Sequence, residues 1–138
     1  MRKSKISISG FKIGTAENRE GLTGVTVILA PDGGATAGVD VRGCAPGTRE
    51  TDLLDPRKTV QKIHAVVLSG GSAFGLEAAS GCVKYLAEQG VGFPIGNVCV
   101  PIVCSAVLFD LMIGDEKAYP DLLMGYEAAK SASSEFLS

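Results

Sequence analysis

The sequence predicts an α/β protein. Three observations carry this prediction. The 138 residues are 46% hydrophobic, which is enough chain to bury the core of one domain. Short β-branched segments alternate with helical patterns along the chain. The 18 glycines exceed the roughly ten expected at about 7% of such a chain, and many follow predicted strands.

The first predicted β-structure is a hairpin. Residues 23–30 (TGVTVILA) are rich in β-branched side chains, and the PDGG segment at 31–34 is a strong turn signal. Residues 37–42 then alternate apolar and polar side chains, as a half-buried strand does. We therefore expect residues 23–30 and 37–42 to pair.

A short helix is expected after the loop at residues 43–54. Asp55 is a suitable N-cap residue, and Pro56 fits the first helical position because proline has no backbone N–H to leave unpaired there. We expect this helix to end at about Lys62.

The middle of the chain predicts a strand, a glycine turn and a helix. Residues 63–69 form an apolar strand pattern that Gly70 and Gly71 interrupt. Residues 72–89 then carry apolar side chains at helical spacings of three and four, and Gly90 follows as a stop signal.

The last third predicts further β-structure and a final helix. Residues 98–111 are rich in strand-forming side chains, and Pro101 favours an edge strand or a bulge because it cannot donate to a sheet. The segment at 119–121 (YPD) should begin a helix that extends to about Ser134.

Composition excludes several classes of function. The net charge is −2 and no basic run is present, so nucleic acid is not an expected partner. The N-terminus lacks the continuous apolar core of a signal peptide, and the apolar stretch at 98–109 is shorter than the roughly 20 residues of a membrane helix. We expect a soluble cytoplasmic protein with no membrane partner.

The four cysteines and the single histidine do not predict a metal site. The cysteines form no C-x-x-C pair, and Cys99 and Cys104 would point to opposite faces of a continuous strand. We expect reduced, mostly buried cysteines, a neutral core histidine at His64, and neither a metal nor a cofactor.

Two glycine-rich stretches, residues 42–50 and 69–76, are the best candidate site. Each is placed where a strand should end, and backbone without side chains can present N–H groups to a ligand. The second stretch has no nucleotide-binding spacing, which favours a small carboxylate or an oxyanion instead.

Ser72 in the second stretch invites comparison with the nucleophile elbow of α/β-hydrolases. The pattern fails because Phe74 replaces the second glycine and His64 precedes the serine. We expect Ser72 to be a helix N-cap. In the first stretch, Arg49 and Glu50 are expected to be a solvated charged surface, or to hold the charged ends of a substrate if the loop covers a pocket.

These stretches carry a family resemblance. Residues 42–54 (RGCAPGTRETDLL), 64–76 (HAVVLSGGSAFGL), 100–103 (VPIV) and 108–111 (LFDL) together resemble the DmpA-type self-cleaving aminopeptidases. This family includes L-aminopeptidase/D-esterases, β-peptidyl aminopeptidases and nylon-oligomer hydrolases. The match extends in order over most of the chain.

The resemblance implies an α/β/β/α four-layer sandwich, shared with ornithine acetyltransferase. It implies a precursor that cuts itself into α and β chains, whose new N-terminal Ser or Thr becomes the nucleophile. Residues 1–138 would be the N-terminal portion of the α chain in a single domain completed by the rest of the precursor, including the β chain. The αβ units are expected to form a homo-oligomer.

The function so implied is an N-terminal-nucleophile aminopeptidase or amidohydrolase acting on small peptides, amides or esters. Two alternatives stay open, an acyltransferase resembling ornithine acetyltransferase and a non-catalytic small-molecule-binding relative. The family's nucleophile lies outside this sequence. The residues expected to bind substrate are Thr48, Arg49, Glu50, Gly70, Gly71, Ser72 and Phe74.

The sequence departs from the family pattern at Cys44, where a second glycine is usual, and at Cys104, where a proline is common. Either change could alter the shape of a loop and the choice of substrate. The family's oxyanion-hole asparagine has no secure match, and Asn97 is a possible contributor.

Overall fold

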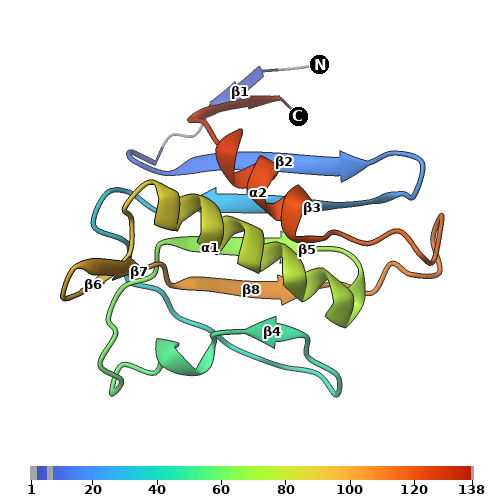
Figure 1. Ribbon diagram of the computed structural model, residues 1–138. Helices are drawn as coiled ribbons and strands as arrows, with labels where there is room; N and C mark the ends of the chain where they lie inside the picture. The colour runs from blue at the N-terminus through green and yellow to red at the C-terminus, as the bar shows by residue number, and fades with distance from the viewer. Residues whose placement is uncertain (1–2, 6–7, 138) are drawn as a thin grey trace.

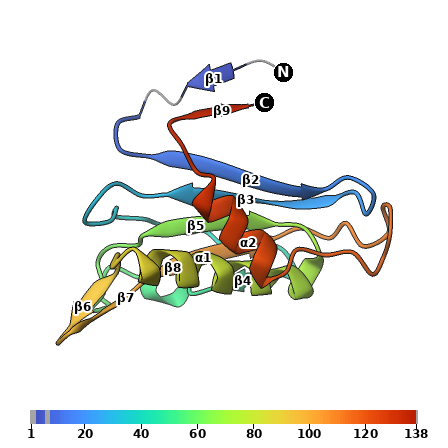
Figure 2. The ribbon, with the colours of Figure 1, turned by 45° about the horizontal axis from the view of Figure 1, so that its top comes forward.

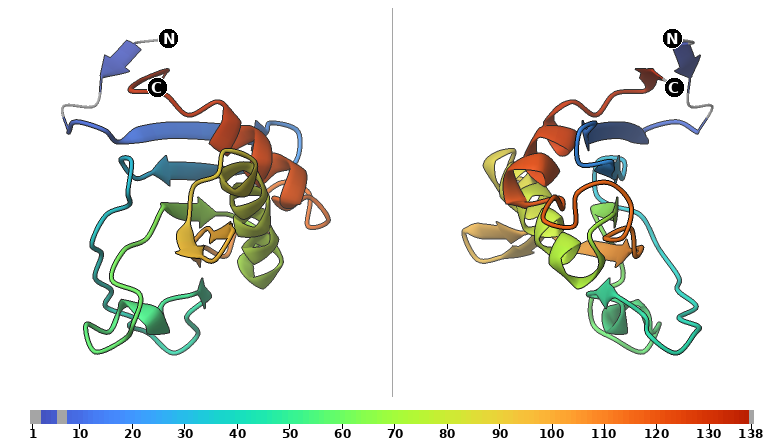
Figure 3. Two further views of the ribbon diagram at one scale, coloured as in Figure 1. Left: turned by 60° about the vertical axis from the view of Figure 1, so that its left-hand side comes forward. Right: turned by 90° about the vertical axis from the view of Figure 1, so that its right-hand side faces the viewer.

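The computed structural model describes residues 3–5 and 8–137, and its main feature is a five-stranded sheet with the two α-helices on one face (Figures 1 and 3). The order in this sheet is β2-β3-β5-β8-β4. The strands are β1 (Lys3–Lys5), β2 (Lys12–Asn18), β3 (Thr23–Leu29), β4 (Thr48–Arg49), β5 (Ala65–Ser69), β6 (Phe93–Ile95), β7 (Val98–Val100), β8 (Val103–Val107) and β9 (Glu135–Leu137). The helical segments are η1 (Asp52–Leu54), η2 (Ser72–Glu77), α1 (Ala78–Glu88) and α2 (Leu122–Lys130), of which η1 and η2 are 3₁₀ helices. Neither α-helix of the described ranges is long and apolar enough to cross a membrane.

The predicted strand at 23–30 is confirmed as β3, but its predicted partner is wrong. Residues 37–42 form no strand, and β3 pairs antiparallel with β2. The sequence pattern of β2 is weak because two of its positions that face the helices are Gly14 and Ala16. Glycine is required at position 14, since a Cβ there would lie 1.9 Å from the carbonyl oxygen of Ala128 in α2.

The predicted short helix at 55–62 is also wrong. This segment is a series of turns that follows η1. The carboxylate of Asp55 accepts the backbone N–H of Arg57 and pairs with its guanidinium group at 2.6 Å. An N-cap makes the same backbone contact, but here the carbonyls of Pro56 and Lys58 accept the side-chain amide of Gln61, whereas in a helix they would accept later backbone N–H groups.

The predicted strand, glycine turn and helix are confirmed as β5, η2 and α1. The helix pattern begins with a 3₁₀ segment, and Gly90 follows α1 with a φ of 69°. Residues 98–111 divide at Pro101 into β7, which pairs with β6, and β8. β8 is an interior strand, parallel to β5 and antiparallel to β4, so the predicted edge position is wrong for it.

The predicted last helix is confirmed as α2. The carboxylate of its N-cap residue Asp121 accepts the N–H of Met124 at 2.8 Å. The helix ends at Lys130, earlier than predicted, because Ser133 and Ile13 exchange backbone hydrogen bonds. The chain then forms β9, which pairs with β1 (Figure 2).

The core lies between the sheet and the two helices. It contains β-branched and small side chains from three strands, including Val27, Val67 and Val103, packed on alanines and Cys82 of the helices. We call the other side of the five-stranded sheet the open face. Neither α1 nor α2 covers it (Figure 3), and Leu68 on this face is 46% exposed.

The two α-helices cross at glycines. A Cβ on Gly81 of α1 would lie 1.9 Å from the carbonyl oxygen of Leu122, and one on Gly125 of α2 would lie 1.9 Å from that of Ala78. Backbone contact at this crossing lets both helices reach the same sheet face.

This crossing predicts that Gly81→Ala destabilises the complete gene product by about 1–3 kcal/mol, because the added methyl group forces the helices apart. Gly38→Ala is the matched control. No atom lies within 4 Å of a Cβ at Gly38, so this change should alter the free energy of unfolding by less than about 0.5 kcal/mol. Denaturant titration measures both, and equal stabilities would contradict the predicted close crossing.

Candidate functional site

The two glycine-rich stretches meet at the C-terminal end of β8. On one side of β8, the carbonyl of Gly47 accepts the N–H of Val107 at 3.0 Å. On the other side, the carbonyl of Ser69 accepts the N–H of Leu108 at 3.0 Å. The sheet therefore brings together two stretches that are about twenty residues apart in sequence.

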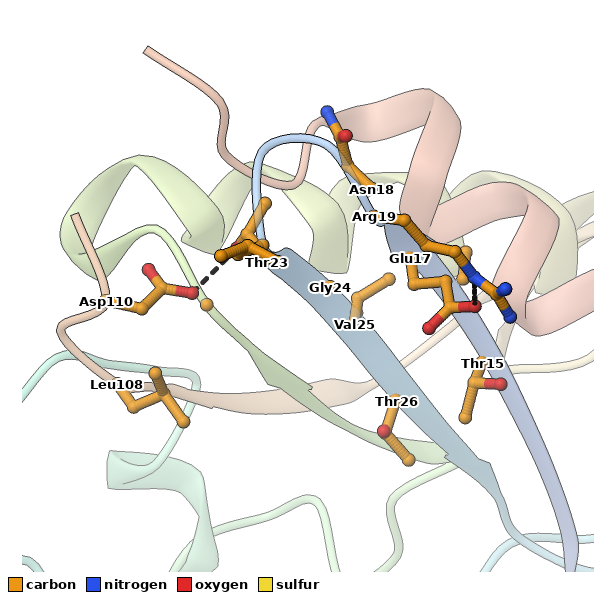
Figure 4. Close-up of a pocket in the computed structure, with 13 residues that line it drawn as sticks. Thr15, Glu17, Asn18, Arg19, Thr23, Gly24, Val25, Thr26, Leu108 and Asp110 are labelled. Carbon is orange, nitrogen blue, oxygen red and sulfur yellow. Dashed lines mark hydrogen bonds and ion pairs between the residues drawn. The ribbon is translucent and has the colours of Figure 1, made fainter. Parts of the chain in front are cut away.

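The open face is hollowed beside these stretches. Three neighbouring hollows extend across it, and adjacent hollows share lining residues. The first lies along β2 and β3 and reaches Asp110 (Figure 4). The second is lined by Leu68, Gly70 and Ala106, and the third by Thr48, Ala106 and the chain at 37–42. We call these three hollows together the open-face groove.

Three successive backbone N–H groups, those of residues 70–72, hold the turn by hydrogen bonds to other segments. The N–H of Gly70 donates to Gly24 at 2.9 Å, and that of Gly71 donates to the Asp110 carboxylate at 2.6 Å. The N–H of Ser72 donates to the carbonyl of Leu108 at 2.9 Å. These three donors have partners within the chain, so in this conformation they are not available to an oxyanion.

Ser72 is not the helix cap that the sequence predicts. Gly71 occupies the N-cap position of η2, with a φ of 81°, and no side chain caps the helix. Ser72 itself has a φ of 53°, a conformation that is uncommon for a residue with a side chain. Phe74 is 58% exposed and stacks on Tyr119 at 4.7 Å between ring centroids, so it forms an aromatic wall beside the turn.

Arg49 and Thr48 of the first stretch point to opposite sides of the sheet. Arg49 pairs in register with Ser105 on the helix side, and its guanidinium group donates to the Ser80 hydroxyl at 2.7 Å. Thr48 pairs with Ala106 and lines the open-face groove. Glu50 is exposed with a φ of 60°, and its carbonyl accepts the Cys104 thiol.

Asn97 does not join these residues. It lies in the turn between β6 and β7, before the start of β8, whereas the glycine-rich stretches lie at its end. Asp110 is a residue of this site that sequence reasoning missed. Its signal was its position just after a strand end, in the LFDL segment that carries the resemblance.

His64 is a core residue, as predicted. Its ring Nδ1 accepts the N–H of Ile102 at 3.0 Å, and burial lowers the pKa of the imidazole. It precedes β5 while Ser72 follows that strand, so the two side chains lie at opposite ends of β5. They cannot act as a base and nucleophile pair.

The cysteines are free, and two of the four are buried. Cys82 and Cys104 are buried, whereas Cys44 and Cys99 are exposed, so the prediction of mostly buried cysteines holds for only two. Burial raises the pKa of the Cys82 thiol to about 12, so it is not a thiolate nucleophile near neutral pH. Within the described part of the chain, no group of three metal-ligating side chains is found.

Comparison of the sequence with known proteins gives consistent matches. The model of peptidase family S58 matches residues 6–135. An uncharacterized aminopeptidase of Mycobacterium leprae is 50% identical over 109 residues, which are 79% of this chain and 30% of that protein. A 6-aminohexanoate-oligomer endohydrolase of Kocuria sp. is 34% identical over 128 residues, which are 93% of this chain and 33% of that protein. The chain thus spans about a third of the length of these curated relatives.

Solved structures share the fold. The PH0078 protein of Pyrococcus horikoshii superposes with a TM-score of 0.65 at 19% identity, over 94% of this chain and 40% of that one. Ornithine acetyltransferase of Mycobacterium tuberculosis superposes with a TM-score of 0.56 at 14% identity, over 96% of this chain and 76% of that one. These likenesses support a mixed α/β fold similar to that of ornithine acetyltransferase.

The buried imidazole predicts a pH dependence. Because burial lowers the folded-state pKa of His64 below its ordinary value of 6.5, the unfolded chain binds a proton more readily. Stability should therefore fall as the pH decreases below about 6.5. His64→Asn keeps an acceptor for Ile102 but does not titrate, so its loss of stability between about pH 7 and pH 5 should be smaller. Denaturant midpoints at both pH values measure this, and equal losses would contradict it.

Proposed function

Because the chain belongs to peptidase family S58, we propose that it is the α-subunit portion of a self-processed N-terminal-nucleophile hydrolase acting on small peptides, amides or esters. The membership confirms the resemblance predicted from the motifs. The proposal also draws on the relatives, whose names describe an aminopeptidase and an oligomer endohydrolase.

The observation that carries the proposal is the open-face groove. A sheet needs both faces covered where they are apolar, and here one face has a helix layer while the other is hollowed and lined by the two glycine-rich stretches. We propose that the rest of the precursor supplies a second sheet and a second helix layer. The complete protein would then be an α/β/β/α four-layer sandwich with its site at this groove.

The nucleophile would be the Ser or Thr that self-cleavage places at the new N-terminus of the β chain. Its hydroxyl oxygen attacks the substrate carbonyl while its own amino group accepts the hydroxyl proton. The C–N bond of an amide substrate then breaks, and the amine leaves with that proton. Water next hydrolyses the acyl ester and restores the hydroxyl group.

This chain would contribute the walls of the site. Thr48, Gly70 and Phe74 border the groove or the turn beside it, and their side chains or backbone would contact the substrate. Glu50 would hold a substrate ammonium group if its loop moves toward the groove. Gly71 and Ser72 would shape the turn, and Arg49 would act from the helix side by supporting Thr48. We expect the αβ units to assemble into a cytoplasmic homo-oligomer.

The direct test is the complete gene product. We expect intact-mass measurement to find two chains, the second beginning with Ser or Thr, and aminoacyl p-nitroanilides or 6-aminohexanoate oligomers to be hydrolysed with water alone. A single uncleaved chain without turnover would contradict the proposal. Release of product only when an amine acceptor such as ornithine is added would indicate an acyltransferase instead.

Ser72 provides a separate prediction. Ser72→Ala in the complete gene product should leave self-cleavage intact and turnover within about twofold of the wild type, because His64 lies at the opposite end of β5 from this hydroxyl group and cannot activate it. A covalent serine-reactive inhibitor should label the N-terminus of the second chain. Labelling of Ser72, or a loss of turnover by several orders of magnitude with the fold preserved, would overturn the proposed nucleophile.

The open face also predicts that residues 1–138 alone do not form a stable native monomer. Exposed apolar side chains such as Leu68, Leu108 and Phe109 favour aggregation or a molten state when nothing covers them. Calorimetry and size-exclusion chromatography of the isolated chain measure this. A cooperative thermal transition of a monomer would be the contrary result.

A further inference from the structure

Asp110 joins three segments that are far apart in sequence. One oxygen of its carboxylate accepts the hydroxyl of Thr23, at the start of β3, at 2.7 Å (Figure 4). The other accepts the N–H of Gly71, after β5, at 2.6 Å. Asp110 itself follows β8, so its one carboxylate connects the ends of three strands.

The fit around this carboxylate is close. A Cβ on Gly70 would lie 2.1 Å from the Asp110 carboxylate and 2.4 Å from the Thr23 hydroxyl. On the other side of the turn, a Cβ on Gly71 would lie 2.5 Å from Cβ of Tyr119. The Gly70 and Gly71 turn therefore has little room to move while Asp110 holds both of its partners.

The held turn borders the proposed site. Gly70 and Leu108 line both the hollow along β3 and the next hollow toward β8. A displacement of the turn would change the shape of the groove on both sides of Gly70. The bonds to Asp110 thus act on the groove through the backbone, without requiring the carboxylate to touch a substrate.

We propose that Asp110 is a positioning residue whose carboxylate fixes the Gly70 and Gly71 turn and so determines which acyl groups the open-face groove accepts. This inference rests on the proposed hydrolase function. It assigns the selection of substrate size to a half-buried hydrogen-bond junction at the end of the groove, which acts through the position of the turn.

Asp115 offers a matched control. Like Asp110 it lies between β8 and α2, but it is exposed whereas Asp110 is half-buried, and its carboxylate accepts the N–H of Lys117 within its own turn, at 2.9 Å. Replacing it removes the same chemical group from the same connection without releasing Gly71.

The test compares four variants of the complete gene product, Asp110→Ala, Asp110→Asn, Thr23→Val and Asp115→Ala. The first readout is the ratio of kcat/KM for glycyl p-nitroanilide to that for 6-aminohexanoyl p-nitroanilide. A loss of folded protein lowers both values equally and leaves this ratio unchanged, whereas a displaced turn changes it.

We expect Asp110→Ala to change the ratio by about fivefold or more and Thr23→Val to change it less. Asp110→Asn should keep the ratio within about twofold of the wild-type value, because the side-chain amide can accept the Gly71 N–H through its oxygen and donate to the Thr23 hydroxyl through its nitrogen. Asp115→Ala should have no effect. An unchanged ratio in Asp110→Ala would overturn the inference.

The second readout does not depend on turnover. Hydrogen exchange in the peptide containing Gly71 should be faster in Asp110→Ala and Thr23→Val than in the wild type, and unchanged in Asp110→Asn and Asp115→Ala. If the wild type hydrolyses neither substrate, the proposed function fails while this readout still decides the role of Asp110. If Asp110→Ala does not fold, Thr23→Val carries the test, and unchanged exchange there would overturn the inference.

Discussion

The five-stranded sheet buries one face against α1 and α2, and this one-sided packing constrains the rest of the molecule. The two helices pack so closely on each other and on the sheet that glycines are required where α1 meets α2 and where α2 meets β2. The apolar side chains on the opposite side of the sheet, such as Leu68, remain exposed on the open face. Since burying apolar surface contributes about 25 cal/mol per Å², an uncovered face of this kind favours a covering layer.

The same constraint explains where the candidate site lies. β5 and β8 are parallel neighbours, so their C-terminal ends meet at one edge, and the chain leaves both through segments that contain Gly70 or Asp110. β4 adds the first glycine-rich stretch on the other side of β8. The sheet therefore brings the first glycine-rich stretch, the Gly70 turn and Asp110 to the same end of β8.

Sequence reasoning predicted the elements whose periodicity arises from burial in this core. β3, β5 and α1 carry strong apolar patterns because they lie at its centre. β2 was missed because close packing on α2 replaces large apolar side chains with Gly14 and Ala16, which removes the pattern. The helix expected after Asp55 is absent, and the side-chain amide of Gln61 bonds to the carbonyls of Pro56 and Lys58, which a helix would pair with backbone N–H groups. Both failures come from contacts that propensities do not contain.

The site was predictable only in part for a similar reason. The glycine-rich stretches could be found because their composition is unusual, but the sequence does not say which side of the sheet each side chain occupies. Arg49 and Thr48 are adjacent, yet one bonds to Ser80 on α1 and the other lines the groove. Asp110 was missed because its partners, Thr23 and Gly71, are near it only after folding.

If another part of the same precursor covers the open face, thiol labelling of the complete gene product should detect the covered positions. Leu68→Cys places a thiol on this face, and Lys84→Cys places one on the exposed side of α1. With each rate compared to that of the denatured protein, we expect much slower labelling at position 68 than at position 84. Equally rapid labelling at both positions would contradict this covering of the open face.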